Sequence, residues 1–451
     1  MKLSVIAKAI DATLYGADGD LPQIAIDSRK ITGGELFIAL KGENFDGHDY
    51  IESALQKGAK VVIAAHEPRT PLEKSVTFLK VKDTTVALGK LGAFWRARFS
   101  LSTVGITGSC GKTTVKGMME SICEQQGKTL ATKGNFNNHI GLPLTLLRLD
   151  ETYQYGVIEM GASGIGEIRY LGNIAKPNVS LITNVMPAHL LGFGSIEGVA
   201  KAKSEIYDIL PHDGIAVLNV DEKFSDFFRT LIKDRKVITY GLRNKSDVTA
   251  TNIEMLPFAV RFDLQLGKEQ QNVIINIPGE HTIMNALAAS AAGLAMGISL
   301  ENIVKGLSVF DGVPGRLRRI KGKNGAILID DSYNANPGSM NAALDVLGHC
   351  QGKKVFVMGD MAELGEDAVL YHEQIGQRAK EKGVQSLFAV GKLSQHAVKA
   401  FGEGAKMYPD KTLLVDELKD QLTQETIVLI KGSRSSGMEA VTNALAHHEE
   451  S

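Results

Sequence analysis

The sequence predicts an α/β protein with three domains, and three observations support this fold class. The chain has 451 residues, and about 150 residues per domain is a usual size. Short apolar runs bounded by Gly, Asn or Asp alternate with helical stretches, which is typical of βαβ units and a parallel sheet. Glycine contributes 47 residues, about 10% of the chain against a usual 7%, and tight strand-to-helix turns need glycine.

The first domain is expected at residues 1–83 as a small α/β unit. A helical stretch is expected at Tyr50–Lys57. Strands are expected at Glu35–Leu40, Lys60–Ala64 and Val76–Val81. A helix that begins at Thr84 and leads into an apolar strand marks the end of this domain.

The second domain, residues 84–313, is expected to be an ATPase-like domain built on a parallel sheet. Its strands are expected at Leu101–Thr107, Tyr155–Met160, Val179–Thr183 and Gly214–Asn219. Between Thr249 and Pro278 the apolar period changes towards two, which indicates antiparallel strands at the edge of the sheet.

The third domain is expected at residues 314–451, after the Gly- and Pro-containing stretch Phe310–Arg318. Strand and helix patterns alternate again from there. The strands are expected at Ala326–Asp330, Lys354–Met358, Ser386–Val390 and Thr426–Ile430. This alternation predicts a Rossmann-like, doubly wound domain.

Composition excludes several classes of protein. The 44% apolar and 22% charged residues are those of a globular chain. Lys and Arg total 50 against 51 Asp and Glu, so the basic excess of a nucleic-acid coat is missing. Cys110, Cys123 and Cys350 have no metal-ligand spacing and indicate reduced thiols. With neither a membrane-spanning apolar run nor a secretory signal, a cytoplasmic location is expected.

The segment TVGITGSCGKTT, residues 103–114, has the context of a phosphate-binding loop. It follows an apolar strand and precedes a helix with Val115, Met118 and Ile122 on one face. The strict motif has glycine where Ile106 stands, so the shorter form is present. Backbone N–H groups, the helix N-terminus and Lys112 would hold phosphates, and Thr113 would bind Mg²⁺. The predicted loop residues are Gly108, Ser109, Cys110, Gly111, Lys112, Thr113 and Thr114; the alternative is a tight turn with a solvated lysine.

Three further residues are candidates for chemistry. Glu159 ends a parallel strand, where a carboxylate is well placed to hold Mg²⁺; the alternative is a solvated glutamate. His189 follows another strand, although a lone histidine is often structural. Lys203 falls on the apolar face of a helix capped by Ser195, whereas Lys201 falls on the polar face. A buried lysine must be paired, neutralised or modified, for example as a carbamate that serves as a metal-side ligand, unless it reaches solvent along the helix.

Polar clusters also follow strands or open helices elsewhere in the chain. GEHTIMNALAA opens a small-residue helix where Asn285 could hydrogen-bond a base. Pro314–Arg316 and the run Asp330–Asn336 begin the third domain, and polar loops recur at 359–365 and 431–436. Such clusters indicate one functional rim of that domain.

These motifs, in this order, resemble those of the Mur ligases, the ATP-dependent amino-acid ligases of peptidoglycan synthesis. The resemblance rests on TGSCGKTT, Glu159, His189 with AKAKSEIY, HTIMNA, PGR and DDSYNANPGS. Residues 27–51 resemble the UDP-binding domain of the members that add the third residue and the terminal dipeptide. GNFNNHIGLPLTLL, HLLGFGSIEGVAKAKSEI and MGDMAELG resemble the dipeptide-adding branch, and the Asp-Asn-Pro-Arg motif of the diaminopimelate-adding branch is absent.

The resemblance implies an activity and a set of site residues. A monomer would use ATP and two Mg²⁺ ions to join D-alanyl-D-alanine to UDP-muramoyl-tripeptide through an acyl phosphate. Lys112, Glu159, His189 and carbamylated Lys203 would be catalytic, with Thr113, Glu159 and His189 on the metal side. The implied contacts are Asn285, Arg316 and Asp331 for ATP; Ser28, Arg29, Lys41 and Asn138 for the UDP-substrate; and Tyr333, Asn334 and Asn336 for the dipeptide.

Three alternatives remain open from the sequence. A diaminopimelate- or lysine-adding Mur ligase would share most motifs. A nucleotide-dependent switch or transport ATPase would carry a carboxylate pair where only Glu159 stands. A non-catalytic UDP-sugar-binding homologue would tolerate the loss of Lys112. Folylpolyglutamate synthetases share the phosphate loop but lack the N-terminal domain.

Overall fold

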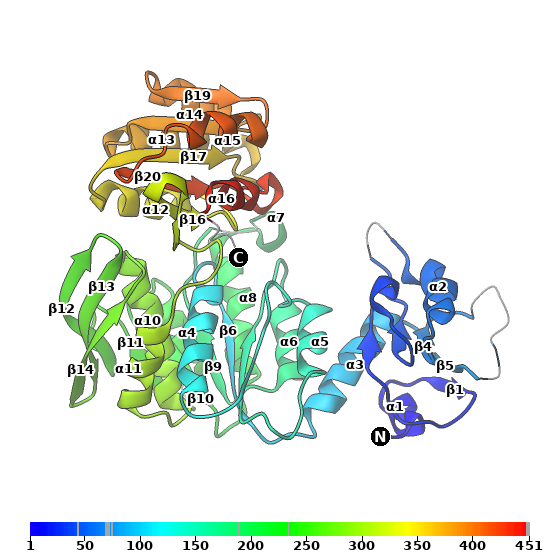
Figure 1. The fold of residues 1–451 in the computed structure, drawn as a ribbon. Coiled ribbons are helices and arrows are strands. Elements are labelled where there is room, and N and C mark those ends of the chain that lie inside the picture. Colours follow the sequence, from blue (N-terminus) through cyan, green and yellow to red (C-terminus); the bar gives the residue numbers. More distant parts are fainter. Residues whose placement is uncertain (43–44, 68–72, 74, 188–189, 233, 448–451) are drawn as a thin grey trace. The chain divides into compact units, whose positions relative to one another are not determined.

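The computed structural model describes residues 1–42, 45–67, 73, 75–187, 190–232 and 234–447. It confirms the predicted α/β class (Figure 1). The chain forms two compact units, which we describe separately. The first comprises Met1–Cys110, Gly127–Val217 and Asp226–Val237, and the second Gly111–Gln126, Leu218–Ser225 and Ile238–Ser451. The domain boundaries expected from the sequence stay predictions.

The N-terminal part of the first unit is a five-stranded sheet in the order β1-β5-β4-β3-β2. Strands β2 to β5 are parallel, and β1 is antiparallel to β5. Its elements are α1 (Leu3–Ala9), β1 (Thr13–Tyr15), β2 (Ile24–Ala25), β3 (Leu36–Ile38), α2 (Ile51–Gln56), β4 (Val61–Ala64) and β5 (Thr77–Lys80). The three predicted strands and the helix are present but shorter, and β1 and β2, of three and two residues, were not predicted.

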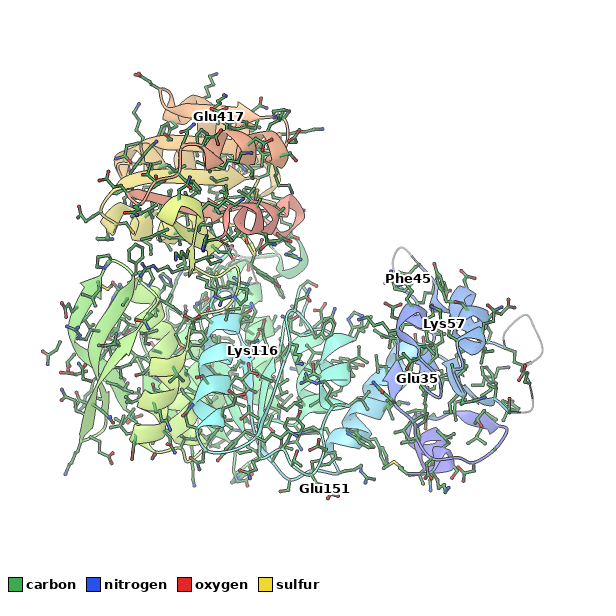
Figure 2. The ribbon with its side chains drawn as sticks, in the orientation of Figure 1. Glu35, Phe45, Lys57, Lys116, Glu151 and Glu417 are labelled. Carbon is green, nitrogen blue, oxygen red and sulfur yellow. The ribbon has the colours of Figure 1, made fainter. Side chains whose placement is uncertain are left out.

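The turn that leads into β3 is fixed by Glu35, which Figure 2 labels. Its carboxylate accepts hydrogen bonds from the Thr32 hydroxyl (2.6 Å), the Thr32 amide (3.0 Å) and the Gly33 amide (2.8 Å). These bonds, led by the Thr32 hydroxyl, lower the pKa of Glu35 to about 2. The carboxylate therefore serves the turn and is ionised at neutral pH.

The rest of the first unit is built on five parallel strands in the order β10-β9-β6-β8-β7. The strands are β6 (Ser102–Thr107), β7 (Thr129–Ala131), β8 (Tyr155–Glu159), β9 (Val179–Ile182) and β10 (Ile215–Asn219). The helices are α3 (Thr84–Arg96), α5 (Gly141–Leu146), α6 (Glu167–Ala175), α7 (Leu190–Phe193), α8 (Ile196–Asp208) and α9 (Ser225–Ile232). Because the carboxyl ends of parallel strands share one edge, the loops after β6, β8 and β9 are neighbours.

In the second unit, α4 (Lys112–Glu124) packs against α10 (Glu280–Ala295) and α11 (Leu300–Val309). The contact is close: a Cβ on Gly306 would lie 2.5 Å from the Ile122 Cα, and the Ser121 hydroxyl donates to the Gly306 carbonyl at 2.7 Å. Here β11 (Lys236–Tyr240) pairs with β12 (Val248–Leu256) in parallel. Strand β13 (Ala259–Leu266) is antiparallel to both β12 and β14 (Glu269–Ile275). The antiparallel strands predicted between Thr249 and Pro278 are therefore confirmed.

The C-terminal part of the second unit is a six-stranded sheet in the order β15-β16-β20-β17-β18-β19. All its strands are parallel except β15 at the edge. The strands are β15 (Arg318–Lys321), β16 (Ile327–Asp331), β17 (Lys353–Gly359), β18 (Ser386–Val390), β19 (Ala405–Tyr408) and β20 (Thr426–Lys431). The helices are α12 (Pro337–His349), α13 (Ala368–Glu381), α14 (Ser394–Phe401), α15 (Lys411–Lys419) and α16 (Glu439–Leu445).

This sheet confirms the predicted doubly wound architecture. One face packs against α15 and α16 through Leu414, Leu418, Val441 and Leu445. Strand β20 lies between β16 and β17 although it comes last in the chain. The connections therefore reverse direction between β17 and β20, which is where ligands bind in open α/β sheets. None of the helices in the described part of the chain combines the length and apolar character that a membrane crossing needs.

Candidate active site

The loop after β6 is fixed in the first unit by the residues that follow β9. The amides of Ser109 and Cys110 donate to the Asn184 carbonyl (3.0 Å) and side-chain oxygen (2.9 Å). The Cys110 carbonyl accepts from the Thr183 hydroxyl at 2.6 Å and from the Asn184 amide at 3.1 Å. The amides of Ser109 and Cys110 are therefore engaged within the first unit.

In the second unit, the same loop continues into α4. Gly111 stands at the helix N-cap with φ +82°, a conformation that favours glycine, and the helix begins at Lys112. The predicted apolar face is confirmed, because Val115, Met118, Met119, Ile122 and Cys123 are fully buried. Lys112, Thr113 and Thr114 are half-buried in the first turn, where helix N–H groups lack intrahelical partners. Gly111 and the first turn of α4 thus have the local geometry expected of a phosphate loop, and phosphate binding there stays a prediction.

Asn285 on α10 contacts this loop. A Cβ on Gly111 would lie 2.5 Å from the Asn285 side-chain oxygen. The structure therefore brings Asn285 to the phosphate loop, and the adenine contact implied by the resemblance stays a prediction. All three cysteines are free thiols, as predicted, and Cys110 is half-buried in the loop.

We expect Gly111→Ala to weaken nucleotide binding at least about 10-fold. The added methyl group would meet the Asn285 oxygen, and φ +82° is unfavourable for alanine. Isothermal titration with ADP measures the effect, and Gly267→Ala, in a distant turn with φ +59° and open space around it, is the matched control. Equal ADP affinity in Gly111→Ala and the unchanged chain would contradict the prediction.

Glu159 ends β8 as predicted, and its side chain is 2% exposed. Its Oε1 accepts from the Asn137 amide at 2.8 Å, and its backbone N–H donates to the Thr132 hydroxyl at 3.0 Å. The Asn137 carbonyl in turn accepts from the Gly161 amide at 2.9 Å. This network fixes the direction of the carboxylate. Asn137 lies in the segment 134–147 that the resemblance singled out, but its role as partner was not predicted.

Lys203 is buried on α8, as the helical pattern predicted. The Ser195 hydroxyl accepts from the Gly198 amide at 3.2 Å and caps the helix. Lys203 is 4% exposed and its Nζ lies 5.9 Å from the centre of the Phe193 ring, whereas Lys201 is exposed. Solvation along the helix is therefore excluded for Lys203. His189 lies outside the described residues.

A second charged residue of α8, Glu205, is also buried and was not predicted to have a role. Its two oxygens accept from the amides of Gly166 (2.7 Å) and Arg169 (3.0 Å) at the start of α6. A carboxylate at a helix N-terminus is favourable because it satisfies N–H groups that have no helical partner. Glu205 thereby ties α8 to the loop that follows Glu159.

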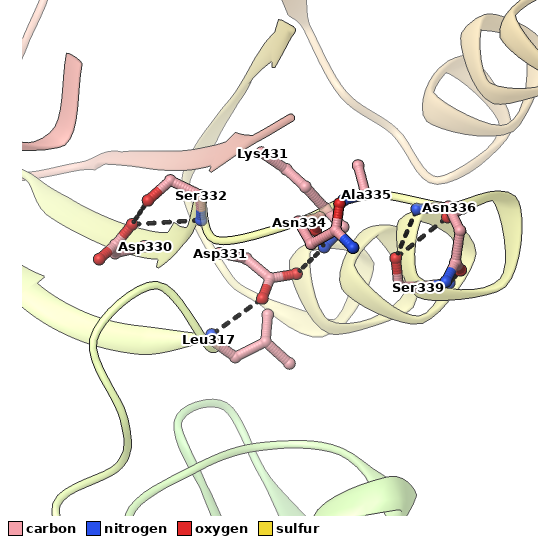
Figure 3. A network of polar contacts seen from close by, with 9 residues as sticks. All are labelled: Leu317, Asp330, Asp331, Ser332, Asn334, Ala335, Asn336, Ser339 and Lys431. Atoms are coloured by element: carbon pink, nitrogen blue, oxygen red, sulfur yellow. Dashed lines mark hydrogen bonds and ion pairs between the residues drawn. The ribbon is translucent and has the colours of Figure 1, made fainter. Parts of the chain in front are cut away.

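Asp331 ends β16 in a buried polar network (Figure 3). Its Oδ2 lies 2.5 Å from the Lys431 Nζ, and its Oδ1 accepts from the Leu317 amide at 3.2 Å. The same ammonium donates to the Asn334 carbonyl at 2.8 Å. Asp331 and Lys431 thus join the start of β15, the loop after β16 and the end of β20. The sequence singled out both residues but did not pair them.

The residues predicted to hold the dipeptide lie in this loop. The Arg316 guanidinium lies 4.2 Å and that of Arg434 5.7 Å from the centre of the Tyr333 ring, an arrangement that cation–π attraction stabilises. The Asn334 side chain accepts from the Ala335 amide at 2.9 Å. Asn336 caps α12 in a reciprocal pair with Ser339. Asn334 and Asn336 therefore shape the loop, and their contact with a dipeptide stays a prediction.

Of the predicted UDP-substrate residues, three follow adjacent parallel strands. Ser28 and Arg29 come after β2, and Lys41 comes after β3. Arg29 makes two hydrogen bonds of 2.9 Å to Asp27, which hold the pKa of that carboxyl at about 2. Asn138 accepts from the amides of Ile140 (3.2 Å) and Gly141 (2.8 Å) at the start of α5.

A metal would have to be held by a mixed set of oxygen donors. In the described ranges no group of three or more His, Cys, Asp or Glu side chains could hold one by itself. Mg²⁺ is usually bound by one or two carboxylates together with phosphate oxygens and water. In the first unit the buried Glu159 carboxylate is a donor of this kind, and in the second unit the Thr113 hydroxyl is another; their joint role on one ion stays a prediction.

Three family models match successive parts of the chain. The Mur ligase family catalytic domain matches residues 21–96, the Mur ligase middle domain residues 106–293, and the Mur ligase glutamate ligase domain residues 315–434. The chain belongs to the Mur ligase family. The three-domain α/β architecture predicted from the sequence is that of Mur ligases, with parallel sheets in the central and C-terminal parts.

Individual Mur ligases align along the whole chain. The UDP-N-acetylmuramoyl-tripeptide–D-alanyl-D-alanine ligase of Escherichia coli is 43% identical over 446 residues, 98% of each chain. The enzyme of the same name from Bacillus subtilis is 36% identical and covers 94% of this chain and 92% of its own. A crystal structure of MurF from Acinetobacter baumannii has a TM-score of 0.90 at 37% identity, covering 98% and 97% of the two chains.

Two further solved structures concern the nucleotide and the alternative enzymes. The MurF ligase of Thermotoga maritima was crystallised with ADP and has a TM-score of 0.80 at 27% identity, covering 94% of this chain and 97% of its own. Folylpolyglutamate synthase of Mycobacterium tuberculosis, at 17% identity and a TM-score of 0.64, shares the fold alone.

Proposed function

We propose that this Mur ligase joins D-alanyl-D-alanine to UDP-N-acetylmuramoyl-tripeptide, with conversion of ATP to ADP and phosphate, in cytoplasmic synthesis of peptidoglycan precursors. The observation that carries the proposal is end-to-end similarity to enzymes of that name, 43% identity over 98% of both chains in one case. The phosphate loop and the polar rim of the C-terminal sheet support it chemically. A monomer is the expected working form.

The reaction needs two steps. In the first, the γ-phosphoryl group of ATP passes to the terminal carboxylate of the tripeptide, giving an acyl phosphate and ADP. In the second, the dipeptide amine attacks the carbonyl carbon, the bond to the phosphate oxygen breaks, and amide and phosphate form as the amine loses a proton. Positive charge around the transferring group stabilises both steps. Lys112 and the first turn of α4 would supply it in the second unit, together with Arg316.

The residues expected to hold Mg²⁺ are chosen for their oxygen and nitrogen donor atoms. Bound Mg²⁺ would neutralise negative charge on the phosphates. Thr113 and Glu159 are the expected ligands of one ion, and Asn137 fixes the direction of the Glu159 carboxylate. His189 and a carbamate on Lys203 are the expected neighbours of a second ion. The carbamate is what the resemblance implies, and the side chain that would carry it is buried.

The test is phosphate release with two pairs of substrates. The full chain with ATP and Mg²⁺ receives UDP-muramoyl-tripeptide plus D-alanyl-D-alanine in one assay, and UDP-muramoyl-dipeptide plus diaminopimelate or lysine in the other. We expect dipeptide-dependent release at least about 100-fold faster in the first, in line with discrimination by buried polar groups. The reverse preference would identify a diaminopimelate- or lysine-adding enzyme, and release that no acceptor stimulates would identify a nucleotide-driven switch.

A further inference from the structure

A pocket of about 340 Å³ opens at the carboxyl edge of the C-terminal sheet. Its walls come from three loops and one helix start: Asp360 after β17, Lys392 after β18, Ser435 and Ser436 after β20, and Lys411 at the start of α15. Figure 1 labels β17, β20 and α15 of this part of the chain. It includes the place where connections reverse between β17 and β20, which is the usual ligand position in such a sheet.

The floor of the pocket is a preformed, closely bonded structure. The Asp360 carbonyl accepts from the Ser433 amide at 2.8 Å and from the Ser436 hydroxyl at 3.0 Å. These bonds fasten the loop after β20 to the loop after β17. Lys411 donates to the carbonyls of Ser436 (2.7 Å) and Gly437 (3.1 Å), so its ammonium also holds the serine loop. A rigid floor lowers the entropy cost of binding a small ligand.

The charges of the pocket favour an anion. Asp360 is the one acidic residue of the lining, and its Oδ1 already accepts from the amides of Leu393 (3.1 Å) and Ser394 (2.7 Å) and from the Ser394 hydroxyl (2.7 Å). Within the ranges that the structure describes, no hydrogen bond or ion pair engages the ammonium of Lys392, which is exposed. An exposed lysine ammonium at the edge of a pocket is a binding group for a carboxylate or a phosphate.

Size and position favour a carboxylate of the acceptor. A volume of about 340 Å³ is at the small end of ligand pockets, about 300–1,000 Å³. Strands β16, β20, β17 and β18 are adjacent and their ends lie level, since Asp331 pairs with Lys431, Lys431 with Met358, and Gly359 with Val390. Three strand spacings of about 4.8 Å separate the Tyr333 loop from the Lys392 loop, about 14 Å. An extended dipeptide covers about 7 Å of this span, and the long lysine side chain can reach across part of the remainder.

We infer that Lys392 binds the C-terminal carboxylate of the acceptor dipeptide and thereby determines specificity for a free acid. The inference rests on the proposed function, and it extends the expected dipeptide site from the loop after β16 to the pocket beside β17 and β18. The ammonium pairs with the carboxylate, and Ser435 and Ser436 line the same pocket. The dipeptide amine is then directed away from the pocket, towards the acyl phosphate.

The test combines a change in the protein with a matching change in the ligand. Steady-state kinetics of the full chain compare D-alanyl-D-alanine with its C-terminal amide. We expect Lys392→Gln to raise the KM for the dipeptide about 10- to 100-fold, with kcat and the KM values for ATP and UDP-tripeptide unchanged. For the unchanged chain, we expect the KM for the C-terminal amide to exceed that for D-alanyl-D-alanine by a similar factor. In Lys392→Gln the acid and the amide should have the same KM, because the ammonium that distinguishes them is absent and changing the carboxylate then has no further effect.

Lys399→Gln is the matched control, since Lys399 is an exposed lysine on the adjacent helix α14. A raised KM for ATP in Lys392→Gln would identify a phosphate site and overturn the assignment, as would an unaltered dipeptide KM. Equal use of acid and amide by the unchanged chain would also overturn it. Failure of the unchanged chain to ligate the dipeptide at all would overturn the proposed function, and this assignment with it.

Discussion

Replacement of Lys112 by alanine is expected to lower kcat for ligation by about 1,000-fold or more. Lys112 is the first residue of α4 and is half-buried beside Gly111, so its ammonium adds a full charge to the partial charge of the helix N-terminus. Loss of a preorganised cation at a transferring phosphoryl group commonly costs factors of this size. Phosphate release under saturating substrates measures the change.

Two further variants make the Lys112 result specific. Lys112→Arg keeps the charge but places it on a planar group of different shape, so we expect it to restore little activity. Lys268→Ala removes an exposed lysine from the distant turn between β13 and β14, and we expect normal turnover. Circular dichroism and urea unfolding should give the same values for all variants. Retained turnover in a folded Lys112→Ala would contradict the assignment of the phosphate loop.

The sequence was informative wherever one local pattern determines both structure and chemistry. The phosphate loop is such a case, because strand, glycine and helix follow one another within about a dozen residues. Position 111 has φ +82°, a conformation that glycine adopts without strain. Lys203 is another, since its position among apolar residues on a helical wheel was sufficient to predict its burial. Strands β16, β17, β18 and β20 of the C-terminal sheet were also predicted to within one residue, whereas β15 and β19 were not predicted.

The partners that fix these residues could not be predicted, because they are distant in sequence. Asn184 holds Cys110 from 74 residues away, and Lys431 holds Asp331 from 100 residues away. In the same way, the Asn137 side chain donates to Glu159, and Glu205 accepts from the Gly166 amide at the start of α6. Such pairs depend on which strands are neighbours and on their register, and periodicity within one segment contains no information on either.

Replacement of Lys203 is expected to lower kcat at least about 100-fold if a carbamate on its amine takes part in the reaction, as we propose. The side chain is 4% exposed on α8, with its Nζ 5.9 Å from the Phe193 ring centre. Reaction of the neutral amine with CO₂ forms a N–C bond and releases a proton, and the product is an anionic carboxylate. A carboxylate of this kind is a suitable ligand for Mg²⁺.

Two substitutions distinguish the carbamate from a purely structural lysine. Lys203→Met retains most of the buried volume, whereas Lys203→Ala leaves space in which acetate can supply a carboxylate. We expect acetate to restore part of the activity of Lys203→Ala but none of that of Lys203→Met. We also expect ¹³C-labelled bicarbonate to give a carbamate signal by NMR in the unchanged chain and in the control Lys201→Met, whose lysine is exposed. Full activity in Lys203→Met would remove Lys203 from the catalytic residues, and an inactive Lys203→Ala without rescue or carbamate signal would indicate that the amine acts unmodified.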